Sequence, residues 1–164
     1  MVLARELICD SGGAGKKRGG LGRRMTIRIP DDVLAPVPPV AIAVQAGRFR
    51  YPPQGIFGGK PGAKAKFLRN ELPADPSGLT FCDPGDTIGF HSAGGGGFGS
   101  ALERDVLAVE KDVIYGYVSL AKAKTDYGVV LDAKTLKADQ DATQILRASM
   151  HVSQASLDVS GGEK

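Results

Sequence analysis

The sequence has no tryptophan, only two cysteines and no long hydrophobic run. Cys9 and Cys82 form no CxxC pair, which excludes the disulfide framework of small secreted proteins and favours a reducing, cytoplasmic location. No segment approaches the roughly 18 consecutive apolar residues of a membrane span, and the first ten residues lack the apolar core of a signal peptide. Aromatic residues make up only 6% of the chain, so few large side chains are available for a core.

Glycine is the residue in excess. The 164 residues include 23 glycines and 10 prolines, and glycine is about twice as frequent as in ordinary proteins. A helix bundle is excluded, because these residues cost about 1 and 3 kcal/mol per interior helix position relative to alanine. The glycines gather in loops at 12–22, 55–62 and 94–99, where we expect the backbone to approach another surface, a ligand or a subunit, closely. The glycines given this structural role are Gly12, Gly13, Gly15, Gly58, Gly59, Gly94, Gly95, Gly96, Gly97 and Gly99.

Apolar patterning before residue 100 predicts short strands. Residues 23–30 alternate between apolar and polar types, which is typical of a half-buried strand. Further strands are expected at 40–45, 48–51, 66–69, 79–82 and 87–91.

The pattern changes at residue 100. Ser100 and Glu103 match a capping box at a helix start, and apolar residues then recur at steps of three and four from 102 to 113. Two more short helices are expected at 119–127 and 139–150.

These patterns predict an α+β fold in one domain. A β-rich region with glycine loops at 1–99 precedes a helical region at 100–150, formed by two or three short C-terminal helices packed on it. Residues 151–164 are expected to form a flexible tail.

Positive charge is concentrated in the first half. Residues 1–70 hold 13 Lys and Arg against 4 Asp and Glu, whereas residues 71–164 hold 8 against 14. The basic residues are interleaved with glycines and show no nucleic-acid motif. An acidic partner subunit or an anionic substrate therefore explains the asymmetry better than nucleic acid does. The candidates for contact with a ligand or an interface are Lys16, Arg18, Lys60 and His91.

Two glycine runs invite comparison with phosphate-binding loops. In the first run, Asp10 and Lys17 occupy the places where a P-loop requires Gly and Ser or Thr. The run at 94–99 contains GxGxxG, but the acidic residue expected about 20 positions later is missing and no βαβ pattern surrounds it. No His, Cys or carboxylate set has the spacing of a metal site. No metal ligand or catalytic residue is therefore assigned.

Four blocks of sequence occur in order at residues 10–22, 52–62, 94–105 and 116–132. Taken together, they resemble the C-terminal portion of the hydantoinase B/oxoprolinase family, which includes acetone and acetophenone carboxylase subunits. The chain departs from the family at Ser100 and Ala101, where relatives usually have Asp-Pro, and at Lys17, where an aromatic residue is common. Stretches that resemble the family's metal site are absent, so the sequence looks like the C-terminal third of such a subunit, encoded as a separate polypeptide.

The resemblance implies a small subunit of a multi-subunit, ATP-dependent, biotin-independent carboxylase of the acetone or acetophenone type. Such an enzyme activates a ketone by phosphorylation before carboxylation, and this chain would have a structural or cavity-shaping role without activity of its own. The implied partners are larger hydantoinase A-like and hydantoinase B-like subunits, which would bind ATP and a divalent metal, with no nucleic acid or membrane involved.

Two other functions remain open at this point. One is a subunit or fragment of an ATP-dependent hydantoinase or 5-oxoprolinase, which hydrolyses an amide. The other, of a different class, is a non-enzymatic anion-binding module, suggested by the basic first half.

Overall fold

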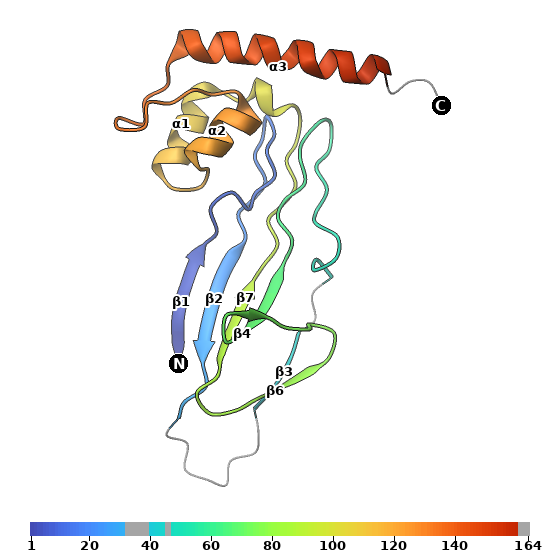
Figure 1. Cartoon of the computed structure of the whole chain (residues 1–164), viewed down its shortest axis with the longest axis vertical. Coiled ribbons are helices and arrows are strands. Elements are labelled where there is room, and N and C mark those ends of the chain that lie inside the picture. The colour runs from blue at the N-terminus through green and yellow to red at the C-terminus, as the bar shows by residue number, and fades with distance from the viewer. Residues whose placement is uncertain (32–39, 45–46, 161–164) are drawn as a thin grey trace.

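The computed structural model describes residues 1–31, 40–44 and 47–160 of the chain. Two β-sheets occupy one end of an elongated molecule and the helices occupy the other (Figure 1). Glycine-rich segments without regular secondary structure connect the two ends. This arrangement confirms the predicted α+β fold, with antiparallel sheets followed by three α-helices.

The larger sheet is antiparallel and has the strand order β1-β2-β7-β4-β5. Its strands are β1 (Val2–Leu7), β2 (Arg23–Arg28), β7 (Thr87–His91), β4 (Lys66–Arg69) and β5 (Leu72–Pro73). A second sheet pairs β3 (Val40–Ala43) with β6 (Leu79–Cys82).

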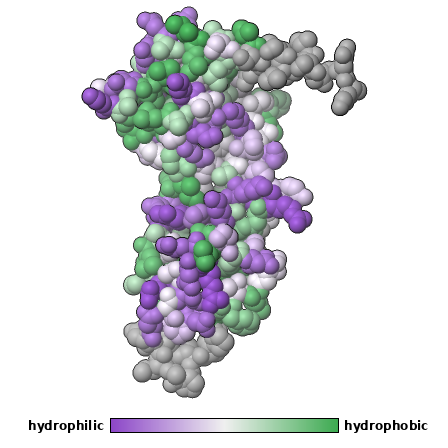
Figure 2. All heavy atoms as spheres, in the orientation of Figure 1, coloured by the Kyte–Doolittle hydropathy of each residue, from purple (hydrophilic) through white to green (hydrophobic). Residues whose placement is uncertain are grey.

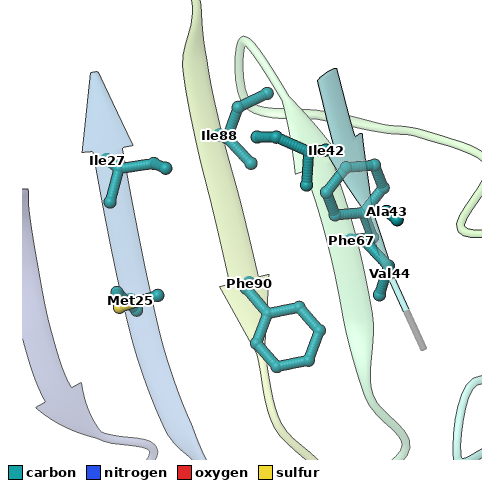
Figure 3. Close-up of a pocket in the computed structure, with 8 residues that line it drawn as sticks. All are labelled: Met25, Ile27, Ile42, Ala43, Val44, Phe67, Ile88 and Phe90. Atoms are coloured by element: carbon teal, nitrogen blue, oxygen red, sulfur yellow. The ribbon is translucent and has the colours of Figure 1, made fainter. Parts of the chain in front are cut away.

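The two sheets share a small hydrophobic core. Its buried side chains are those of Ile29, Phe67, Cys82 and Ile88. Successive side chains of a strand point to opposite faces of the sheet, and the apolar ones point into the space between the two sheets. Figure 3 shows the side chains of β2, β7, β4 and β3 that line an apolar cavity of about 250 Å³ on this face.

The helical end begins with the 3-10 helix η1 (Ala101–Glu103) and continues with the α-helices. These are α1 (Val106–Ile114), α2 (Leu120–Tyr127) and α3 (Gln140–Ser160). A second hydrophobic core lies between them and includes the fully buried Val109, Ala123 and Val129. In the view of Figure 2, hydrophobic residues also reach the surface of this end, among hydrophilic ones.

Two local predictions are wrong. The capping box does not form, because Arg104 is extended after η1 and Ser100 makes no side-chain cap. The first α-helix instead starts at Val106, where the carboxylate of Asp105 accepts a hydrogen bond from the Ala108 amide. Residues 48–51 form a turn and bend instead of a strand.

Other elements differ from the sequence predictions in extent. Strand β1 and the two-residue β5 were not expected. Helix α3 continues past residue 150 to Ser160, so residues 151–160 of the expected tail are helical. Residues 45 and 161–164, on which predictions also fall, lie outside the described residues.

Candidate functional site

The three glycine-rich segments pack against one another and form a bundle between the sheets and the helices. We call residues 11–22, 53–63 and 92–99 the glycine bundle. The Gly13 amide donates to the Gly95 carbonyl over 2.8 Å, and the Gly95 amide donates to the Gly20 carbonyl over 2.8 Å. The middle segment joins both neighbours, since the Lys60 amide donates to the Ala14 carbonyl over 2.7 Å and the Lys60 carbonyl accepts from the Gly97 amide over 2.9 Å.

Most of the glycines singled out from the sequence leave no room for a side chain. A Cβ on Gly97 would lie 2.6 Å from the carbonyl carbon of Ala14 and 2.8 Å from the Gly13 oxygen. Backbone atoms are equally close at Gly12, Gly13, Gly15, Gly59, Gly94 and Gly96. Gly58 and Gly99 have positive φ values, and a Cβ on Gly95 would meet the Gly20 nitrogen at 3.1 Å. The atoms that these glycines approach therefore belong to other segments of the same chain.

This packing determines what the glycine runs can bind. A phosphate loop needs backbone amides that are free to donate to an anion. Here the amides of Lys16 and Lys17 donate to Gly99 and Phe98, and the Gly19 amide donates to Gly13. In the run at 94–99, the amides of residues 94, 95, 97, 98 and 99 all donate to backbone carbonyls. The amides of these residues are committed to holding the bundle together.

Three of the four candidate residues form ion pairs with carboxylates of the helical end. Lys16 Nζ lies 3.0 Å from Glu103 Oε2, with both side chains 54% exposed. Lys60 Nζ lies 2.8 Å from Asp126 Oδ1, and Lys122 Nζ lies 3.2 Å from the other oxygen of the same carboxylate.

The third pair, between Arg18 and Asp112, is the most buried. Arg18 Nε lies 3.1 Å from Asp112 Oδ2, and the two side chains are 15% and 10% exposed. Arg104 approaches the same carboxylate oxygen at 2.8 Å, and the Arg18 guanidinium stacks over the Tyr117 ring at 5.4 Å. Close by, burial raises the pKa of the Tyr127 hydroxyl to about 12.

Several basic residues of the first half thus pair with acidic residues of the second half inside one chain. They do not converge on a single point, because their partners lie on η1, α1 and α2. The fourth candidate, His91, lies apart from them on β7, where it lines a cavity on the larger sheet.

Sequence reasoning did not single out Asp112 or Arg104. A signal was present, since Glu110 and Asp112 are adjacent to apolar positions of α1 and are themselves buried. The partner of Glu110 is Lys137, which with the Ala138 amide lowers the pKa of that carboxyl. Carboxylates beside the apolar stripe of a helix therefore indicated buried ion pairs.

The described residues offer no metal centre. Within residues 1–31, 40–44 and 47–160, no three His, Cys, Asp or Glu side chains are grouped so that they could hold an ion. The divalent metal implied by the sequence resemblance therefore has no fitting ligand set in this part of the chain.

Among the described helices, none combines the length and the apolar character that crossing a bilayer requires.

The fold and the four sequence blocks define the family of this chain. The profile of the Hydantoinase B/oxoprolinase family matches residues 1–101, and the chain belongs to that family.

Among its relatives is the caprolactamase subunit beta of Pseudomonas jessenii, which is 33% identical over 91% of this chain and 26% of that subunit. The acetophenone carboxylase delta subunit of Aromatoleum aromaticum is 38% identical over 68 residues, which are 41% of this chain and 10% of that subunit.

Solved structures agree with this assignment. An ATP-dependent caprolactamase from Pseudomonas jessenii superposes with a TM-score of 0.65 at 28% identity, over 90% of this chain and 26% of that one. A nucleotide-free acetone carboxylase superposes with a TM-score of 0.74 over 95% of this chain and 25% of that one. The TM-score shows a shared fold, at a sequence identity of 21%. The chain spans about a quarter of the length of these proteins.

Proposed function

We propose that this chain is a non-catalytic structural part of an ATP-dependent enzyme complex that acts on the carbonyl group of a small molecule. The observation that supports this role is the glycine bundle, whose backbone groups bond to one another and which three ion pairs join to the helical end. Such a bundle keeps the sheets and helices at a fixed separation, because backbone hydrogen bonds join all three of its segments.

The chain's own residues provide rigidity and shape in this proposal. In the complex, ATP supplies a phosphoryl group that activates a carbonyl or amide oxygen, and larger hydantoinase A-like and B-like subunits bind the nucleotide and its metal. Arg18 and Asp112 hold α1 against the bundle, and Lys60 and Asp126 hold α2. We propose that Lys16, Arg18 and Lys60 act through these contacts and leave the reacting atoms to other subunits.

We further propose that the reaction is the hydrolysis of a cyclic amide. The caprolactamase subunit matches along 91% of this chain, and the similarity therefore includes the bundle, the sheets and the helical end. Ketone carboxylation is the second candidate, supported by the higher identity of the acetophenone carboxylase subunit over its shorter match.

Reconstitution with the larger subunits tests both the structural role of the chain and the reaction of the complex. The chain is co-expressed with hydantoinase A-like and B-like subunits, and ATP hydrolysis is measured with a lactam or a ketone, each with and without bicarbonate. We expect a stable complex whose lactam-dependent ATP hydrolysis needs no bicarbonate. Bicarbonate-dependent hydrolysis with the ketone would replace the first reaction by the second.

The matched control is the same complex assembled without this chain, which should have lost most of its activity. Purification of the chain as a stable monomer that binds no larger subunit would refute the structural role.

A further inference from the structure

Three basic side chains form a row across the open face of the larger sheet. Arg24 of β2 lies opposite His91 of β7, and His91 lies opposite Lys66 of β4. Residues that are directly opposite in antiparallel strands project from the same face of the sheet. The strand register alone therefore brings Arg24, His91 and Lys66 side by side, away from the core between the two sheets.

This row places three basic side chains beside one another, and the carboxylates near it are Glu6 and Glu71, of which Glu71 lines the adjacent pocket. Like charges directly opposite each other destabilise a sheet, and burial, Arg24 and Lys66 together lower the pKa of His91 below its usual value. Arg24 pairs with Glu6 of β1. In the described part of the chain, the side chains of His91 and Lys66 have no hydrogen-bond or ion-pair partner. His91 and Lys66 are therefore available to a ligand, and an anion would offset the cost of placing basic groups opposite one another.

A hollow lies next to the row. Gly89 is opposite Thr26 on one side and Leu68 on the other, and it lines a pocket together with Leu68, whose Cβ lies 3.2 Å from the place that a Gly89 Cβ would take. The pocket there has a volume of about 300 Å³ and includes Arg24 and His91 among its lining residues. The rest of the lining comes from Leu3, Thr26, Leu68, Thr87 and Gly89, together with Glu71 from the turn between β4 and β5.

We propose that this pocket binds a small organic anion. Its carboxylate or phosphate group contacts the row formed by Arg24, His91 and Lys66, because an anion with several acceptor oxygens satisfies several cationic donors at once. Its nonpolar part rests against Leu68 and Leu3. The site lies on the sheet and outside the glycine bundle, so it does not depend on the structural role proposed above.

The two histidines of the chain make the test direct, since His91 lies at the pocket and His151 is exposed on α3. The imidazole proton resonances of both are followed by NMR while the full chain is titrated with inorganic phosphate and, separately, with butyrate. We expect saturable shifts at His91 and a rise in its pKa, with His151 unchanged. A rise of one pKa unit corresponds to about tenfold tighter binding to the protonated form.

Two variants give the matched comparison. The Lys66→Gln variant should weaken binding several-fold, whereas Lys134→Gln, which removes an exposed lysine in the turn before α3, should leave it unchanged. The dispersion of the same spectra shows whether each variant is folded. Saturation by butyrate alone or by phosphate alone would support the site and identify the acidic group.

Equal shifts at the two histidines, or unchanged binding in the Lys66→Gln variant, would overturn the proposal. A response to poly-glutamate but to neither small anion would also overturn it, and would assign the row to an acidic protein surface.

Discussion

Adding one methyl group to Gly97 should destabilise the whole molecule, because the glycine bundle has no space for it. The new Cβ would overlap the carbonyl of Ala14 and lie 2.8 Å from the Gly13 oxygen. Both obstacles are backbone atoms, so no side chain can rotate away to relieve the overlap. The segments must separate instead, which strains the hydrogen bonds that cross between them.

The size of the effect follows from the bonds at this point. Gly97 donates to Lys60 over 2.9 Å, it accepts from Ile56 over 3.0 Å, and Lys60 donates to Ala14 over 2.7 Å. Weakening these three bonds costs about 1 kcal/mol each, and overpacking adds about 2 kcal/mol. The Gly97→Ala change should therefore lower the free energy of unfolding by about 5 kcal/mol, a large part of the roughly 5–15 kcal/mol that stabilises a typical domain.

Urea unfolding followed by circular dichroism measures this difference. With a typical slope of about 2 kcal/mol per molar urea, the midpoint should fall by about 2.5 M. The matched control is Gly20→Ala in the same bundle, where an added Cβ meets nothing within 4 Å. That variant should be unchanged or slightly more stable, because alanine restricts the unfolded chain.

The comparison separates crowding from a general preference for glycine. If the midpoint of Gly97→Ala lies within about 0.3 M of that of Gly20→Ala, the close packing described for the bundle is wrong.

Two further predictions concern the charged side chains. The Asp112→Ala variant leaves two mostly buried arginines without their shared carboxylate and should lose about 3 kcal/mol of unfolding free energy. The Glu103→Ala variant, which breaks an exposed pair, should lose at most about 0.5 kcal/mol; equal losses in urea unfolding would contradict this ranking. Hydrogen bonds from Asn70 and Arg69 lower the pKa of Asp86 to about 2. Because the folded pKa is the lower one, this stabilisation is complete above about pH 4 and is lost as the pH falls toward 2. The Asp86→Asn variant should show a flatter dependence of unfolding free energy on pH in that window, and an unchanged slope would exclude Asp86 as its source.

Local signals in the sequence were sufficient for several elements. The alternation at 23–30 predicted β2, and Ser119 and Gly128 mark the ends of α2, where the Ser119 hydroxyl caps the helix and Gly128 has a φ of 62°. These features depend on neighbouring residues only. Strand β1 was missed because its residues are mostly exposed at the sheet edge, so its sequence lacks the alternation of a half-buried strand.

The first helix shows where local reasoning failed. Ser100 and Asp105 are both good capping residues, and the sequence pattern favoured the first. In the structure, Arg104 is extended between them, and its guanidinium pairs with Asp112. The helix therefore begins after Arg104.

By itself, the sequence determined the family, the α+β class and the positions of the glycine loops, because four ordered blocks and local periodicity are properties of the chain alone. Tertiary structure decided what the glycines approach and which charges meet. The pairs of Lys16, Arg18 and Lys60 join residues 87, 94 and 66 positions apart, and the row of Arg24, His91 and Lys66 depends on the register of three strands. Such contacts form only when segments far apart in the sequence are brought together, and no local sequence pattern specifies which segments meet.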